Sequence, residues 1–205
     1  QYAKFAPSNP MIWMMRSSLS RHQGDSVGAM AALDSLERRE PSPRWRGFVQ
    51  GARADLALVR GRLREAERLR QGAMATFELM PRGAPGFYLS DAIALARIDL
   101  VLRDNAGDAL RKVEAALARN PISSMPAPDR PYLLLANFYA DAGRVDLARR
   151  MVAAYEREVD EALREEGGAR YNVAGSIAMA EGALEEAVAA FRRYRDEPPA
   201  GPLTG

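Results

Sequence analysis

Few residues in this chain are of a type that could carry out chemistry, and they are scattered. His22 is the single histidine, and cysteine is absent, which removes thiolate catalysis, disulfides and most structural zinc sites. His22 falls near the end of a predicted helix, where a histidine can bond the last free carbonyl groups. That role explains His22 better than metal binding or base catalysis does.

The carboxylates, serines and glycines form no recognisable active site either. Acidic residues gather between 156 and 166, but arginines interrupt them in the pattern of a solvated helix face. Ser123 and Ser124 stand in no motif, and the segment 82–86 lacks the Lys-Ser/Thr pair that would hold a nucleotide phosphate. We therefore expect no catalytic residue, no metal site and no cofactor, and we predict that the protein is not an enzyme.

Arginine is abundant enough to need its own explanation. The segment 38–70 holds ten arginines and four acidic residues, and such a segment could bind the phosphates of a nucleic acid. The arginines near its end spread around a predicted helix instead of following one side: Arg60, Arg62, Arg64, Arg68 and Arg70. Only Trp45 and Phe48 lie nearby to stack on bases. A solvated face is favoured, and nucleic-acid binding through 38–70 is a weaker alternative.

The elements that must position these residues are helices. The chain of 205 residues contains 37 Ala, 21 Leu and 9 Met, but only 17 Val, Ile and Thr together. Because β-branched residues favour strands and unbranched ones favour helices, this composition predicts an all-α protein. No apolar run approaches the roughly 20 residues of a membrane-spanning helix. The predicted helices are about 11–22, 26–39, 45–59, 62–79, 88–103, 107–119, 130–142, 144–165, 169–181 and 183–195.

The sequence repeats itself with a period of about 39 residues. A small residue recurs at Ala29, Ala66, Ala109, Ala148 and Ala187, with spacings of 37, 43, 39 and 39. Glycines precede four of these alanines at a constant distance: Gly24, Gly61, Gly143 and Gly182, with Asp104 at the matching place in the third copy. Larger residues recur as well: Trp13, Tyr132, Tyr139, Tyr171 and Phe191, with the small Gly175 between the last two.

Each repeat is interpreted as two antiparallel helices. The glycine comes where the first helix must end, because glycine tolerates the left-handed conformation found there. The alanine marks the closest crossing of the second helix, and apolar residues follow it on the same face. The two proline-rich connections, 81–85 and 121–131, could be insertions on one face of an array, but we favour simple spacers.

This pattern resembles the tetratricopeptide repeat, in which aromatic, glycine and alanine positions recur in helix pairs of about 34 residues. The resemblance covers about 185 residues and implies a right-handed α-solenoid of about five helix-turn-helix repeats. Their ranges are about 11–41, 45–80, 88–121, 130–166 and 169–199. The spacing exceeds 34, so helices or connections must be longer, and the helix that begins at Arg144 is expected to reach about Arg164. The second copy departs most, with Gln50 and Arg70 at positions that are usually aromatic.

The resemblance also implies a binding groove lined by the first helix of each pair. The register places seven candidate residues there: Met14, Ser18, Asp55, Leu133, Asn137, Asn172 and Ser176. Ala94 and Ile98 take the same positions in the third copy. Asn137 and Asn172 are the most specific, because an amide can bond an extended peptide in both directions. Met11, Met14 and Met15 around Trp13 are either an adaptable binding patch or, as we favour, the seam for a preceding repeat.

These features predict a protein–protein interaction scaffold without catalysis, within a larger bacterial signalling or regulatory protein. The resemblance extends to arrays attached to bacterial kinases, cyclases and transcription regulators. The alternative is a peptide or small-ligand sensor that controls such an attached effector domain. Both ends of the chain look cut, so we expect a fragment of a longer protein. We expect a protein or peptide partner and a cytoplasmic location, although the lack of cysteine leaves the periplasm open.

Overall fold

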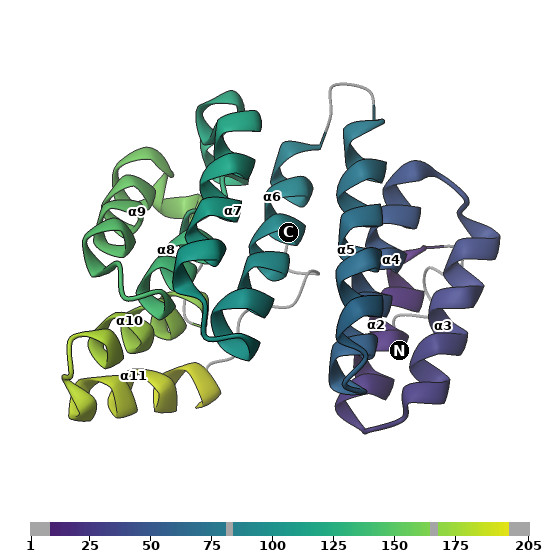
Figure 1. The fold of residues 1–205 in the computed structure, drawn as a ribbon, viewed down its shortest axis with the longest axis horizontal. Helices are drawn as coiled ribbons and strands as arrows, with labels where there is room; N and C mark the ends of the chain where they lie inside the picture. Colours follow the sequence, from purple (N-terminus) through teal and green to yellow (C-terminus); the bar gives the residue numbers. More distant parts are fainter. Residues whose placement is uncertain (1–8, 81–83, 165–167, 197–205) are drawn as a thin grey trace. The chain divides into compact units, whose positions relative to one another are not determined.

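The computed structural model describes residues 9–80, 84–164 and 168–196, and every regular element in these ranges is helical (Figure 1). The all-α prediction is confirmed. The α-helices are α2 (Met11–His22), α3 (Ser26–Arg39), α4 (Pro43–Val59), α5 (Leu63–Glu78), α6 (Pro85–Arg97), α7 (Ala106–Arg119), α8 (Tyr132–Asp141), α9 (Val145–Glu158), α10 (Gly168–Ala180) and α11 (Leu184–Asp196). Four short turns are η1 (Ile98–Leu102, π-helical), η2 (Ile122–Ser124), η3 (Ala127–Asp129) and η4 (Glu161–Leu163). The predicted repeat ends at 166 and 199 lie outside the described residues.

The expected long helix 144–165 is wrong, because α9 ends at Glu158. Val159 is extended, with φ −95° and ψ 128°, and its side chain is only 3% exposed. Arg164 turns back and donates a hydrogen bond from Nε to the carbonyl of Val159 at 2.9 Å. Asp160 then accepts a bond from the backbone N–H of Ala162 and starts η4. The extra residues of this repeat therefore lie in a connection and not in the helix.

The chain divides into two compact units, residues 1–95 and 96–205. In the first unit α2 packs on α3 and α4 packs on α5, and α3 also contacts α4. Its core contains the fully or almost fully buried Ala29, Leu33, Leu36, Val49 and Leu56. Trp13, Met14 and Trp45 pack against this core while remaining partly exposed. α2, α3 and α4 therefore share this core, and a second cluster of Ala54, Ala57 and Ala66 joins α4 to α5.

In the second unit α8 packs on α9, α10 packs on α11, and α8 also contacts α10. Tyr132, 1% exposed, meets Tyr155 edge to face with 6.4 Å between ring centroids. Tyr139 is also buried. Gly175 provides room between α10 and α11, because a Cβ atom there would lie 2.5 Å from the ring of Phe191. The small residue thus allows the last two helices to approach closely.

The turns inside the helix pairs share one backbone conformation. Four glycines have positive φ: Gly24 at 76°, Gly61 at 71°, Gly143 at 71° and Gly182 at 78°. Asp104 is the only other described residue with positive φ, at 51°. The next backbone N–H closes each glycine turn by bonding a carbonyl five residues earlier, as Arg144 does to Tyr139 at 2.7 Å.

The third turn closes one residue later than the others. The N–H of Asn105 bonds the carbonyl of Asp99, six residues earlier, at 2.9 Å. The π-helical segment η1 precedes it, and a π turn holds one more residue than an α turn. The insertion accounts for part of the longer spacing between Ala66 and Ala109.

The recurring alanines share one environment. Ala29, Ala66, Ala109, Ala148 and Ala187 are all 0% exposed. Each lies in the first turns of a second helix, in α3, α5, α7, α9 and α11. A larger side chain would overlap with packed neighbours, so the alanines set how closely the helices approach.

Candidate binding site

The predicted groove residues lie on first helices, but several of them bond neighbouring helices. In the first unit Met14 packs on the core and Ser18 is exposed. Asp55 of α4 accepts a hydrogen bond from Arg21 of α2 at 3.1 Å, and it also pairs with Arg70 of α5. Asp55 therefore links three helices.

Arg70 lies between Asp55 and a second carboxylate. The sequence did not predict this buried ion pair. The side chain of Arg70 is only 13% exposed and also pairs with Asp91 of α6, whose side chain is 8% exposed. Gly51 makes room for the pair, because a Cβ atom there would lie 3.1 Å from Nη1 of Arg70 and 3.3 Å from Oδ1 of Asp91. Burial raises the pKa of Asp91, and Arg70 opposes that rise. The signal in the sequence was a charged residue at a position that is apolar in the other copies.

In the second unit Asn137 takes the repeat position that Asp55 has in the first, six residues before the glycine of the turn. Its Nδ2 donates to Oγ of Ser176 at 2.8 Å, and its Oδ1 accepts a bond from Arg97. Asn137 and Ser176 are 7% and 9% exposed. Arg97 also pairs with Asp141 at 2.6 Å, and burial raises the pKa of Asp141 while Arg97 opposes the rise. The amide group proposed to hold a peptide backbone thus already joins α8 to α10.

The other predicted groove residues differ in exposure. Asn172 is partly exposed on α10, and Leu133 is partly exposed on α8. Ala94 is partly exposed on α6, whereas Ile98 is buried in η1. Among the seven candidates, only Leu133 lines a cavity formed by α8, α9, α10 and α11 in the second unit.

That cavity has a volume of about 500 Å³ and lies among α8, α9, α10 and α11. Aliphatic and aromatic side chains make up much of its lining: Leu133, Val152, Tyr155, Tyr171, Val173, Ala174, Ile177 and Ala178. Charged residues complete it: Arg149, Glu156, Arg170, Glu181 and Glu186. The sequence did not predict this site, since the expected groove was lined only by the first helix of each pair, whereas α9 is a second helix.

Ion pairs from α9 to α10 and to the turn that follows it lie at this cavity. Arg149 donates three bonds to Glu181, from Nε at 3.0 Å and from Nη2 at 2.7 and 2.8 Å, and Glu181 directly follows α10. Arg170 lies 3.5 Å from Glu156. Tyr171, which also lines the cavity, has the guanidinium of Arg193 5.7 Å from its ring centroid. These ion pairs lie beside the aliphatic and aromatic part of the lining.

A smaller hollow of about 380 Å³ lies near the turn of α8 and the end of α10. Its lining includes Asp141, Ser176, Met179 and Phe191. Ser176 is the predicted groove residue there, and its hydroxyl already accepts the bond from Asn137.

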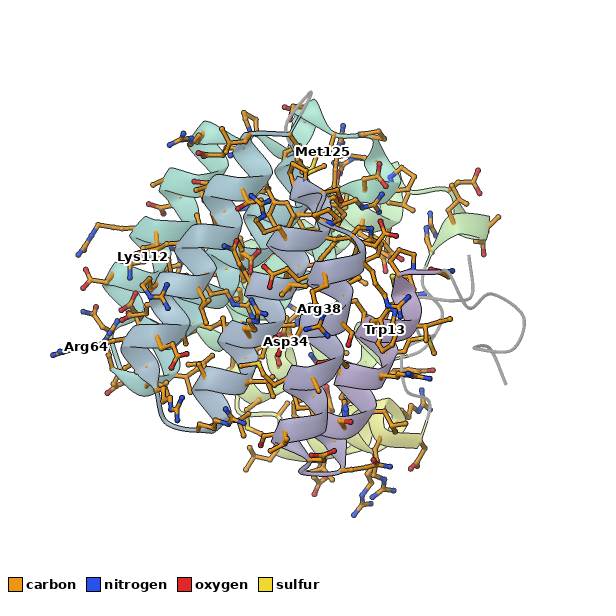
Figure 2. The ribbon with its side chains drawn as sticks, turned by 90° about the vertical axis from the view of Figure 1, so that its right-hand side faces the viewer. Trp13, Asp34, Arg38, Arg64, Lys112 and Met125 are labelled. Carbon is orange, nitrogen blue, oxygen red and sulfur yellow. The ribbon has the colours of Figure 1, made fainter. Side chains whose placement is uncertain are left out.

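The predicted arginine segment divides by environment in the structure. Arg70 points inward, and Arg53 binds Asp34 and Glu37 at 2.7 and 2.8 Å. Arg64 and Arg68 are exposed four residues apart on α5, and Figure 2 shows Arg64 extending away from the ribbon. The segment is therefore partly structural and partly exposed.

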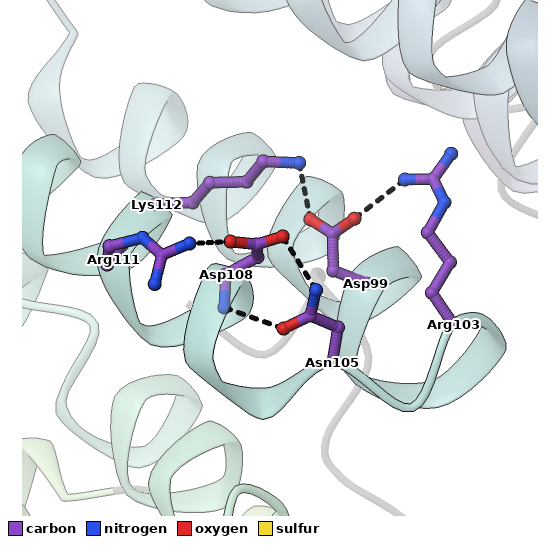
Figure 3. A network of polar contacts seen from close by, with 6 residues as sticks. All are labelled: Asp99, Arg103, Asn105, Asp108, Arg111 and Lys112. Carbon is purple, nitrogen blue, oxygen red and sulfur yellow. Dashed lines mark hydrogen bonds and ion pairs between the residues drawn. The ribbon is translucent and has the colours of Figure 1, made fainter.

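A polar network in the second unit surrounds Asp99 (Figure 3). The carboxylate of Asp99, 6% exposed, accepts bonds from Arg103 at 2.6 Å and from Lys112. Burial alone would raise the pKa of Asp99, but the bonds from Lys112 and Arg103 outweigh it and lower the pKa. Beside it, Asn105 caps α7 by accepting a bond from the N–H of Asp108 at 3.0 Å. This network ties η1 to α7.

The remaining candidate for chemistry is His22, whose Nδ1 lies 2.7 Å from the carbonyl oxygen of Ser18. This contact at the end of α2 is the one expected from the sequence. Within the described residues, no three His, Cys, Asp or Glu side chains are grouped so that they could hold a metal ion. No helix in the same ranges has the length and apolar character to cross a membrane.

No family model and no curated protein matches the chain.

Proposed function

We propose that this chain is a non-catalytic interaction module that binds a segment of a partner protein. The observation that carries the proposal is the cavity of about 500 Å³ in the second unit, lined largely by aliphatic and aromatic side chains. A pocket that combines apolar side chains with charged groups can receive an apolar side chain and bind the polar groups of a short segment beside it. Arg149, Glu156, Arg170 and Glu181 would contribute the polar rim.

The proposal includes a tetratricopeptide-like array of about five right-handed helix pairs. The shared turn conformation and the five fully buried alanines support a common unit. We further propose that the array belongs to a larger bacterial signalling or regulatory protein, works in the cytoplasm, and connects partners instead of transforming substrates. The bonds of Asn137 and Asp55 to other helices favour the α9–α10 cavity over these residues as the contact point.

The test is site-specific photocross-linking in cells of the source organism. A photoreactive amino acid at Ala174, which is exposed and lines the cavity, should yield a defined cross-linked protein. Ile177→Glu in the same chain should abolish that product, because a carboxylate would be desolvated in an apolar site. Val188→Glu, at a 46% exposed position of α11 outside the cavity, is the matched control and should leave it.

Equal cross-linking in both variants would contradict the cavity as the contact site. Circular dichroism of both variants checks that the helices remain folded, so that a lost product reports lost contact.

A second function is favoured by the size of the same cavity. Sites for small molecules measure roughly 300–1,000 Å³, and about 500 Å³ lies within that range. The module would then be a sensor for a small, largely apolar ligand that controls an attached effector. A thermal-melt screen separates the two: stabilisation by one metabolite, lost in Ile177→Glu, supports the sensor, whereas a cross-linked protein supports the scaffold.

A further inference from the structure

The first unit has a hollow of its own between α2 and α3. Its volume is about 290 Å³. Leu19, Gly28 and Ala31 contribute to its lining, with Trp13, Arg16 and Ser35 beside them. Ala31 is exposed and small, so the surface offers space for an apolar group there, whereas the Asp25 carboxylate fills the place of a Cβ beside Gly28. The hollow is therefore a small apolar depression with a tryptophan and an arginine among its lining residues.

Three arginines gather around this hollow. The guanidinium carbons of Arg16 and Arg39 lie 4.9 and 5.2 Å from the ring centroid of Trp13. Arg38 donates a hydrogen bond to Oγ of Ser35 at 3.3 Å. Figure 2 shows Trp13 and Arg38 projecting from α2 and α3. Contact with the ring and with the serine orients these exposed guanidinium groups before any partner arrives.

The carboxylates of the same helices do not neutralise these arginines. α2 contains no acidic residue. The two acidic residues of α3, Asp34 and Glu37, both bind Arg53 of α4. Most other described arginines of the chain form ion pairs, including Arg21, Arg70, Arg97 and Arg149. Arg16, Arg38 and Arg39 are held by the ring of Trp13 or by Ser35, and Asp34 and Glu37 are bound to Arg53.

We infer that this surface, Trp13 with Arg16, Arg38 and Arg39 around the α2–α3 hollow, binds an acidic amphipathic segment of a partner protein. One apolar side chain of the segment enters the hollow, and carboxylates on either side of it pair with the guanidinium groups. Each guanidinium presents N–H groups in a fork that matches a carboxylate. The residues of this surface differ from those that line the cavity of the second unit.

The arrangement favours an acidic polypeptide over a nucleic acid. Sequence-tolerant binding of single strands needs aromatic ring faces on which bases stack. Trp13 is partly buried against the core, and two guanidinium groups lie near its ring. Residues 1–8 carry Lys4 and no carboxylate side chain, so that segment of the chain does not complement the site.

The experiment measures binding of a fluorescent peptide, one leucine flanked by glutamates at helical spacing, to the whole chain by anisotropy. The double variant Arg16→Glu/Arg39→Glu should weaken binding at least about tenfold. The matched control Arg64→Glu/Arg68→Glu makes the same change of charge at exposed positions of α5 and should shift the Kd less than about twofold. Replacing the glutamates of the peptide by glutamines should cost at least about tenfold.

Two further variants test the hollow itself. Ala31→Trp fills it without changing charge and should weaken the peptide by about tenfold, whereas Ala75→Trp, at an exposed position of α5, should not. The chain has two tryptophans, so in a Trp45→Phe background the emission of Trp13 should shift on peptide binding. Circular dichroism of each variant confirms that it remains folded.

Four outcomes would overturn the inference. The first is no binding at millimolar peptide, and the second is equal weakening by both charge-reversal variants, which indicates general electrostatic attraction. The third is tighter binding of a single-stranded oligonucleotide with the same sensitivity to Arg16→Glu/Arg39→Glu. The fourth is a dimer in sedimentation experiments that this variant dissociates, which would make a second copy the occupant.

Discussion

Arg70 lies four residues after Ala66, one of the recurring alanines, at a position where other helix pairs have the fully buried Leu33 or Val113. The guanidinium reaches the carboxylates of Asp55 and Asp91 instead of filling an apolar space. A mostly buried ion pair adds little net stability compared with apolar packing, but removing one partner leaves a buried charge. The sequence shows an arginine at a normally apolar position. Only the fold shows which carboxylates pair with it, since they are 15 and 21 residues away along the chain.

Arg70→Met should lower the free energy of unfolding by about 3–5 kcal/mol, because Asp91 would remain buried without its cation. Adding Asp91→Leu should recover much of that loss, since both charges would be gone. Urea denaturation measures both values. Arg68→Met, exposed two residues earlier, is the control and should change stability by less than about 0.5 kcal/mol. A loss of that small size in Arg70→Met would contradict the role of the pair.

The lowered pKa of Asp99 predicts that the free energy of unfolding depends on pH in the acidic range. Its pKa in the folded chain lies below the usual value of 3.8, so the unfolded chain binds the proton more readily. The stability that Asp99 contributes is therefore present above about pH 4 and is lost as the pH falls through the folded-state pKa. Asp99→Asn should reduce the slope of unfolding free energy between about pH 5 and pH 3.

Lys112→Met should reduce that slope as well, because Lys112 is a cause of the lowered pKa. Urea denaturation at a series of pH values is the measurement. A slope that stays unchanged in both variants would show that Asp99 makes no such contribution.

At the scale of the elements, the sequence predicted the alternation of helices and turns well. Glycine and alanine positions carry this information locally, because backbone conformation and close crossing depend on the residue itself. The predicted end of α9 was wrong because the charged pattern of the sequence continues past Glu158. Only the structure shows the break, where Arg164 bonds the carbonyls of Val159 and Glu156. The α9–α10 cavity was missed for a similar reason, since it depends on how far two helices separate.

Substitutions at two equivalent turn positions, Asp104 and Gly143, should change the free energy of unfolding in opposite directions. Asp104→Gly should raise the free energy of unfolding by about 0.5–1 kcal/mol, because glycine adopts positive φ without the penalty of a side chain. Gly143→Ala should lower it by about 1 kcal/mol for the same reason, although a Cβ there meets nothing within 4 Å. Urea midpoints of the two variants should move in opposite directions. Shifts of the same sign would contradict the shared turn conformation.

At the scale of the whole molecule, the principal helix packing is between neighbours along the chain. The pairs α2–α3, α4–α5, α8–α9 and α10–α11 have the most extensive contacts among the described helices. Each unit also has a buried cluster of its own. In such an arrangement a local defect is expected to stay local, because few contacts carry it to distant helices.

Gly175→Ala tests this locality. Its added methyl would overlap the ring of Phe191 and should cost about 1–3 kcal/mol of stability. Hydrogen exchange should show faster exchange in α10 and α11 and unchanged protection in α2 and α3. Adding Phe191→Leu should restore part of the protection, since a smaller side chain leaves room for the methyl. Uniform loss of protection through all helices would contradict local packing.

The open turns have a practical consequence for building on this chain. At Gly24, Gly61, Gly143 and Gly182 a Cβ atom would meet no other atom within 4 Å, so a longer connection would extend directly into solvent. Each doubling of a flexible loop costs only about 0.6 kcal/mol in closure entropy. Foreign epitopes, protease sites or whole small domains inserted beside these glycines should therefore leave the helix pairs intact. The chain offers a scaffold on which grafted segments are carried at defined steps along the sequence.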